Sequence, residues 1–274
     1  MVEEYRVVLR GSPTSVVDWG GPGVPMLALH GHFGRGRTFA GLAQRLPDQF
    51  RLISFDQRGH GASEARGDFS RGAYVADAAE LLRQYLPAPA VVLGHSSGGV
   101  TAYQLAARYP DLVRALVVVD IGAVTGKPHV EHPILDLRGW PRGVASRHDL
   151  GREIEIRGVP DVGYFLDSAV ERPDGWGFLF DYDDMMTSQR AAVGDYWSDW
   201  VSSSCPALLV RGGRSPLLSA EMARQMIERR PNAVLCELPG RGHFLPTEDP
   251  AGLGRAIAAF LLEACHEALS INQQ

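Results

Sequence analysis

A serine flanked by two glycines is the strongest chemical signal in the chain. Ser96 is the centre of a Gly-x-Ser-x-Gly pattern that runs from Gly94 to Gly98, between an apolar run and a helical pattern. This context is typical of a sharp strand-to-helix turn that holds a nucleophile. Such a turn leaves almost no room for side chains on the residues two positions before and after the nucleophile, so these residues are glycines. Ser97 does not meet that condition, because His95 stands at one of its flanking positions. The pattern therefore predicts Ser96 as a nucleophile.

A histidine near the end of the chain is the best candidate for the base that a serine hydroxyl needs. His243 follows the last predicted apolar strand, in the stretch from Leu238 to Phe244. This position places it at the same carboxyl edge of the predicted sheet as Ser96. We therefore predict that His243 takes the proton of Ser96.

Short apolar runs and helical patterns alternate along the chain and predict the elements that would carry these residues. The runs are each bounded by Gly, Pro or Asp, and they predict strands over residues 5–10, 15–19, 26–30, 51–55, 90–93, 115–119, 207–211 and 233–238. The last six contain Val, Leu and Ile with little alternation, as expected of strands covered on both faces of a mostly parallel sheet. Helical patterns lie over residues 39–46, 73–86, 98–109, 220–229 and 251–268. This order indicates an open, doubly wound α/β sheet.

One long stretch interrupts the alternation, between the strand that ends near Asp120 and the strand that begins near Pro206. It is too long for an ordinary loop and should carry its own structure. Helical patterns at residues 162–170 and 185–200 lead us to predict a helical lid. The expected organisation is a core formed by residues 1–122 and 205–274, with the lid at 123–204.

The chain resembles the α/β-hydrolase superfamily, and more closely its lidded esterase, amidase and carbon-carbon-bond hydrolase branches. Beyond the glycine-flanked serine, the likeness rests on His30-Gly31 after the third strand and on the Asp-Gln-Arg-Gly-His-Gly-Ala-Ser run at residues 56–63. It extends from about residue 6 to residue 262, with only the lid hard to match. The resemblance implies the α/β-hydrolase fold, a mostly parallel eight-stranded sheet flanked by helices with a helical lid inserted after the sixth strand. The family's order of serine, acid and histidine is also available.

The acid is where this sequence departs from the family pattern. Most relatives carry it in a Gly-x-x-Asp turn after the seventh strand, where this chain reads Gly-Gly-Arg-Ser at residues 212–215. Asp120 instead ends the strand that should lie beside the one bearing Ser96, and some family members place their acid there. We predict Asp120 as the group that orients His243. Glu221 and a triad without a strong acid are the alternatives.

The same resemblance predicts which backbone N–H groups stabilise the tetrahedral intermediate. One donor is expected from Ser97, directly after the nucleophile. In relatives the second comes from the residue after His-Gly, here His32, with Phe33 as the neighbouring alternative. Other aromatic and arginine side chains near the site or in the lid are candidates for the substrate pocket: Phe33, Arg147, Arg157, Trp176, Trp197 and Phe244. A lid arginine would pair with a substrate carboxylate through a bidentate contact.

Composition and the remaining motifs exclude several other classes. A net charge of -5 argues against nucleic acid as the main partner, because phosphate binding needs a basic face. No stretch approaches the roughly 20 apolar residues that cross a bilayer, and the start of the chain is acidic where a secretory signal would be basic. The three cysteines fit no metal-ligand spacing, and we expect a reduced, cytoplasmic protein.

Two further motifs do not match the binding sites that they suggest. The glycines at residues 31–36 run in the reverse order of a dinucleotide fingerprint. A calcium loop starting at Asp181 would need Gly at its sixth position and Glu at its twelfth, where the chain has Met186 and Ala192. We therefore expect neither a metal nor an organic cofactor.

These observations together predict a serine hydrolase that cleaves a small-molecule carboxylic ester through an acyl-enzyme on Ser96. Hydrolysis of an amide, or of a carbon-carbon bond, in a small carboxylated substrate is the alternative reaction. A noncatalytic receptor that holds a ligand in the same pocket is the alternative of another class, ahead of a purely structural protein. The expected partner is a small-molecule substrate, without nucleic acid or membrane, and a homodimer is left open.

Overall fold

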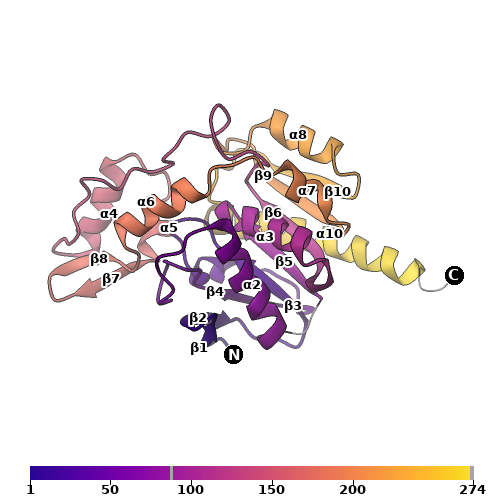
Figure 1. Cartoon of the computed structure of the whole chain (residues 1–274), viewed down its shortest axis with the longest axis horizontal. Helices are drawn as coiled ribbons and strands as arrows, with labels where there is room; N and C mark the ends of the chain where they lie inside the picture. The colour runs from indigo at the N-terminus through magenta and orange to yellow at the C-terminus, as the bar shows by residue number, and fades with distance from the viewer. Residues whose placement is uncertain (87–88, 272–274) are drawn as a thin grey trace.

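The predicted strands pair into a single eight-stranded sheet in the computed structural model, which describes residues 1–86 and 89–271 (Figure 1). The side chains beyond residue 263 lie outside the described part. The strand order is β1-β2-β4-β3-β5-β6-β9-β10. The strands are β1 (Glu3–Leu9), β2 (Ser12–Asp18), β3 (Val24–Leu29), β4 (Phe50–Phe55), β5 (Ala90–His95), β6 (Val113–Val119), β9 (Ala207–Gly212) and β10 (Ala233–Leu238). Only the pairings of β2 with β1 and with β4 are antiparallel. The predicted mostly parallel sheet is confirmed.

Helices cover both faces of this sheet. Successive residues of a strand point to opposite faces, so the central strands contribute apolar side chains to a core on each side. In β5, Val92 packs in one core cluster while Val91 and Leu93 pack in the other. The first cluster is closed by α2 (Arg71–Tyr85), α3 (Ser97–Arg108) and α8 (Ala220–Glu228). The second is closed by α1 (Ala40–Ala43), α9 (Leu245–Glu248) and α10 (Pro250–Ile271). Short 3-10 turns, η1 (Gly36–Phe39) and η2 (Pro110–Leu112), precede α1 and β6. The run of apolar residues without alternation therefore reflects burial on both faces.

The segment between β6 and β9 folds differently from the two helices that we predicted. It contains α4 (Arg147–Ile156), α5 (Val162–Leu166), the hairpin of β7 (Ala169–Arg172) with β8 (Gly175–Phe178), α6 (Tyr182–Ala191) and α7 (Trp197–Ser202). The helix predicted over 162–170 ends at Leu166, and the last two residues of that pattern belong to the hairpin, whose turn is Pro173-Asp174. The helix predicted over 185–200 is interrupted between α6 and α7, where Gly194 donates its N–H to Thr125 Oγ1. The insertion is therefore a mixed helix and hairpin unit.

This insertion has a core of its own, and only its last helix packs with the sheet. Residues from α4, α5, β8 and α6 form a third apolar cluster that also includes Phe33 of the sheet domain. Trp200 of α7 lies instead in the first core cluster, fully buried, and its indole N–H donates to the carbonyl of Met226. Figure 1 shows α4–α6 and the hairpin beyond one end of the sheet and α7 near α3 and β10. The part of the insertion that stands apart from the sheet therefore ends before α7.

None of the described helices is long and apolar enough to cross a lipid bilayer. Cys205 and Cys236 are free and half-buried. The side chain of Cys265 lies outside the described residues.

Candidate active site

The strand-to-helix turn at Ser96 has the strained geometry that the sequence predicts. β5 ends at His95, α3 begins at Ser97, and Ser96 between them has a φ of 55°. A Cβ atom on Gly94 would lie 2.2 Å from the carbonyl oxygen of Gly98. A Cβ on Gly98 would lie 2.2 Å from the carbonyl oxygen of Leu29. A side chain on Gly94 would push α3 away from β5, and a side chain on Gly98 would push α3 away from β3. The two glycines are therefore required for the turn.

Asp120 and His243 form a hydrogen-bonded pair beside this turn. Asp120 directly follows β6, the neighbour of β5 in the sheet, with a φ of 58° and no exposure to solvent. Its Oδ2 accepts a hydrogen bond of 2.7 Å from Nδ1 of His243. Since Nδ1 carries the proton in this bond, the lone pair of the neutral imidazole is on Nε2.

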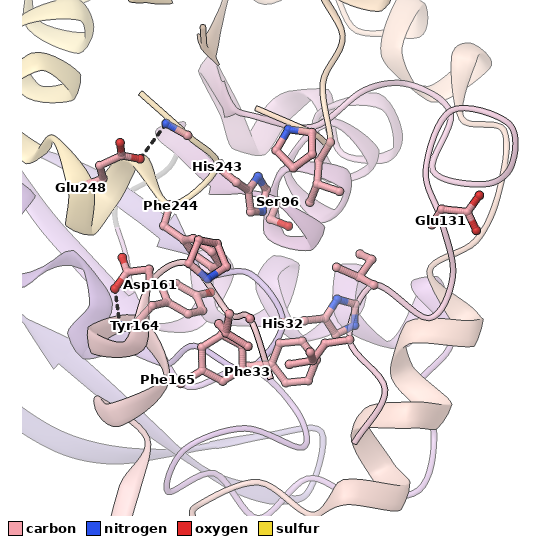
Figure 2. Close-up of a pocket in the computed structure, with 18 of the residues that line it drawn as sticks. His32, Phe33, Ser96, Glu131, Asp161, Tyr164, Phe165, His243, Phe244 and Glu248 are labelled. Atoms are coloured by element: carbon pink, nitrogen blue, oxygen red, sulfur yellow. Dashed lines mark hydrogen bonds between the residues drawn. The ribbon is translucent and has the colours of Figure 1, made fainter. Parts of the chain in front are cut away.

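The ring of His243 points to Ser96, and both residues line one cavity (Figure 2). In the described part of the chain no hydrogen bond joins Ser96 to His243. Such bonds are often long before substrate binds and tighten in the reacting complex. The arrangement is the one expected for a nucleophile, a base and an orienting acid, and these three roles stay a prediction.

The structure separates the candidate acids. Two more donors point at the Asp120 carboxylate: the N–H of Gly212 is 2.8 Å from Oδ1, and the hydroxyl of Ser215 donates to Oδ2. Glu221, the alternative acid, lies on the exposed side of α8, where Arg224 and Gln225 bind its carboxylate. Asp120 alone of the two contacts His243.

The two predicted oxyanion donors lie on either side of the turn. Ser97 is the first residue of α3, and His32 follows β3 in a loop closed by the N–H of Gly34 on the carbonyl of Gly31 at 3.3 Å. Within the described residues, neither the N–H of His32 nor that of Ser97 has a hydrogen-bond partner. The His32 side chain turns to the lid, where Nε2 lies 2.9 Å from Ser188 Oγ of α6. Their role as donors to an oxyanion stays a prediction.

Tyr164 of α5 reaches the same place and was not anticipated from the sequence. Its side chain is buried, and its hydroxyl has no partner among the described residues. The hydroxyl lies 3.0 Å from the point where a Cβ on Gly31 would sit, and the Cβ of Ser96 lies 2.9 Å from that point. Burial raises the pKa of Tyr164, so the hydroxyl keeps its proton. A residue of the insertion therefore presents a hydroxyl group near Ser96.

Helix α5 is fixed to the segment that carries His243. Asp161 caps this helix by accepting the N–H of Tyr164 at 3.0 Å. The other carboxylate oxygen of Asp161 accepts the hydroxyl of Thr247, four residues after His243. The lid and the histidine loop are thus held together next to the cavity.

The cavity has a volume of about 1070 Å³ and is closed on one side by aromatic side chains. Of the predicted pocket residues, Phe33, Arg157 and Phe244 line it. Tyr164 and Phe165 of α5 complete this aromatic wall (Figure 2). The size is at the upper end of the range for small-molecule sites.

Three of the predicted pocket residues do not line this cavity. Arg147 is exposed at the start of α4 and donates to the carbonyl of Leu166. Trp176 lies in β8, where its backbone bridges to Val144 at the far side of the insertion. Trp197 packs against the first core cluster under Arg229. The prediction was wrong for these three because sequence alone does not say which face of the lid a side chain occupies.

The charged side chains that line the cavity are mostly bound to other groups. The guanidinium of Arg157 pairs with Glu153 and lies 5.0 Å from the centre of the Trp140 ring. Glu248 accepts the N–H of Gly242 at 2.7 Å. Arg214 is exposed and has no side-chain partner among the described residues. Among the described lining residues, Arg214 is therefore the charged side chain that remains free to meet a ligand.

Neutral buried histidines next to the site predict an acid-sensitive fold. His30 Nε2 accepts the N–H of Gln57 at 3.0 Å, and Nδ1 donates to the Gly31 carbonyl, so a second proton would break this arrangement. Burial lowers the pKa of both His30 and His60 to about 3. Below the pKa of 6.5 that each histidine has in the unfolded chain, the unfolded chain binds a proton that the folded protein does not bind. The folded state therefore loses stability as the pH falls from 6.5 toward 3. We expect the free energy of unfolding to fall by about 1 kcal/mol per pH unit for each such histidine.

This expectation is checked by urea unfolding between pH 6.5 and 5, before most carboxylates take up protons. His60→Gln should reduce the slope of the free energy of unfolding against pH. His148→Gln, at an exposed position in α4, should leave that slope unchanged. A wild-type free energy of unfolding that is constant over this interval would contradict the prediction.

Comparisons with known proteins agree with this fold. A family model described as the alpha/beta hydrolase fold matches residues 24–250. The 2-(acetamidomethylene)succinate hydrolase of Mesorhizobium japonicum is 29% identical over 257 residues, which cover 88% of this chain and 89% of the relative. A pimeloyl-[acyl-carrier protein] methyl ester esterase of Chromobacterium violaceum is 31% identical over 262 residues, with 88% and 95% covered. A crystal structure of E-2-(acetamidomethylene)succinate hydrolase superposes with a TM-score of 0.82 at 26% identity, covering 95% of this chain and 99% of that one.

Proposed function

The chain belongs to the α/β-hydrolase fold family and is a hydrolase, and we propose that it cleaves a small-molecule carboxylic ester through an acyl-enzyme on Ser96. The observation that carries the proposal is the Asp120–His243 pair, which lies beside a strained Ser96 at the wall of a large cavity. This constellation activates a hydroxyl that is otherwise a weak nucleophile.

The reaction proceeds in two halves on these residues. Ser96 Oγ attacks the ester carbonyl as His243 Nε2 takes its proton, and Asp120 stabilises the imidazolium that forms. The backbone N–H groups of His32 and Ser97 hold the negative oxygen of the tetrahedral intermediate. His243 then gives its proton to the leaving alcohol. In the second half, water attacks the acyl-enzyme, His243 takes a proton from it and returns one to Ser96, and the acid is released.

The cavity favours an ester whose acid part is apolar and larger than acetate. Its volume is about 1070 Å³, and aromatic side chains of Phe33, Phe165 and Phe244 form its wall. The arginine beside this wall, Arg157, already binds Glu153. A substrate carboxylate would therefore have only the exposed Arg214 as a free cationic partner among the described lining residues.

The test is the mass of the intact wild-type protein after exposure to a fluorophosphonate, followed by peptide mapping. We expect a single adduct, located on Ser96, because the probe reacts with activated serines. The same protein should hydrolyse p-nitrophenyl esters with kcat/KM rising from acetate to medium-chain acids. Absence of an adduct on the folded protein, or an adduct on another residue, would contradict the proposed chemistry.

Hydrolysis of an amide in a small carboxylated substrate is the second candidate. It is favoured by the likeness to 2-(acetamidomethylene)succinate hydrolase, a protein whose name gives an amide bearing carboxylates. In this chain the free Arg214 at the cavity would be the group to bind a carboxylate. Kinetics on matched ester and amide pairs, with and without a carboxylate, separate the two candidates. A preference for carboxylated amides that is lost in Arg214→Gln would select the second one.

A further inference from the structure

The hydroxyl of Ser215 is held by its own loop in a position to donate to the catalytic acid. Ser215 follows β9 and is nearly buried. Its Oγ accepts the N–H groups of Leu217 at 3.1 Å and Leu218 at 3.4 Å. Because these two donors occupy the oxygen lone pairs, the hydroxyl proton remains for Oδ2 of Asp120, which Ser215 contacts.

Ser215 and His243 meet at a single oxygen atom. Oδ2 of Asp120 accepts both the Ser215 hydroxyl and Nδ1 of His243, while Oδ1 accepts the N–H of Gly212. The carboxylate therefore cannot rotate without losing hydrogen bonds on both of its oxygens. A donor on Oδ2 also withdraws negative charge from the atom that faces the imidazole, which lowers the affinity of His243 for a proton.

We infer that Ser215 is a positioning residue of the triad, which fixes the Asp120 carboxylate and tunes the basicity of His243. The inference rests on the proposed function, since it assigns these roles to Asp120 and His243. It also links the acid to the substrate cavity, because the neighbours of Ser215, Arg214 and Pro216, line that cavity.

The shared contact has a second consequence. Both the Ser215 hydroxyl and the His243 ring lie within hydrogen-bond distance of Oδ2, so a carboxylate that starts at position 215 can occupy the space around this atom and reach the ring. With asparagine at position 120, the amide nitrogen would then face a new acceptor. An aspartate at position 215 is therefore expected to orient His243 in place of Asp120.

The first test is the pH profile of kcat and kcat/KM for Ser215→Ala. Loss of a hydrogen bond to a charged group should lower kcat about 10- to 100-fold with KM little changed. The acidic limb of kcat/KM should move to higher pH, because Asp120 without its donor holds the protonated His243 more strongly. Ser215→Thr, which keeps the hydroxyl, should restore both. A structural role alone would not move the limb, so an unshifted profile with wild-type kcat in Ser215→Ala would overturn the inference.

A matched control and an exchange variant complete the experiment. Ser219 lies in the same loop, and its hydroxyl caps α8 and does not contact Asp120. Ser219→Ala should therefore leave the pH profile unchanged. The Asp120→Asn, Ser215→Asp double variant should be at least tenfold more active than Asp120→Asn alone. A folded double variant without recovery would contradict the shared position. Fluorophosphonate labelling of the wild type tests the proposed function separately, so failure of one idea is distinguishable from failure of the other.

Discussion

Replacing Ser96 with alanine is expected to lower kcat by about a million-fold, by analogy with serine enzymes in which the nucleophile is removed. The reason is that no other hydroxyl of the described site stands in its position at the end of β5. Tyr164 is near, but burial raises its pKa, so it does not supply an anionic oxygen. Turnover of a p-nitrophenyl ester and fluorophosphonate labelling should both be lost together.

The fold should survive this change, which makes the result interpretable. Alanine at position 96 has to adopt the same positive φ of 55° as serine, so the strain in the turn is similar in both proteins. The melting temperature should therefore remain close to that of the wild type. Ser198→Ala, at an exposed position of α7, is the matched control and should keep full activity. Retention of more than about one per cent of the activity in Ser96→Ala would exclude Ser96 as the nucleophile.

The parts of the site that follow from local sequence could be predicted, and those that depend on distant contacts could not. The turn at Ser96 is specified by Gly94 and Gly98, which stand within two residues of it, and the structure shows why a Cβ is excluded at each. Asp120 could be chosen because adjacent parallel strands end at one edge of the sheet. Ser215 stands in the turn where most relatives carry the acid, but its contact with Asp120, across 95 residues of sequence, could not be predicted from that turn.

The lid was harder to predict for a related reason. Its helices and hairpin are short, and their apolar residues pack on each other and on Phe33 rather than on a regular sheet face. Trp176 and Trp197 have the same residue type and lie in the same insertion, yet one is in the hairpin and the other against the sheet core. Tyr164, with no motif around it, reaches the nucleophile. Aromatic content therefore identifies a packed insertion but does not tell which ring faces the substrate.

Asp120→Asn is expected to lower kcat by about a thousand- to ten-thousand-fold, as in a serine protease whose triad aspartate was replaced. Three donors converge on this buried carboxylate, from Gly212, Ser215 and His243. An asparagine side chain has one oxygen acceptor and one NH2 donor, so at least one of these donors must face another donor. If the amide nitrogen faces His243, the imidazole places its proton on Nε2 and can no longer accept the proton of Ser96.

The measurement is kcat across pH, together with the rate of fluorophosphonate labelling, which needs the same base. Both rates should fall in Asp120→Asn, and raising the pH should not restore them, because deprotonation does not move the proton of the neutral imidazole from Nε2 to Nδ1. Asp111→Asn, at an exposed position before β6, changes the net charge equally and should leave both rates unchanged. A kcat within tenfold of the wild type in Asp120→Asn would show that Asp120 is not the acid that orients His243. Because Glu221 is bound to Arg224 on the outer side of α8, the site would then work as a pair of Ser96 and His243 without a strong acid.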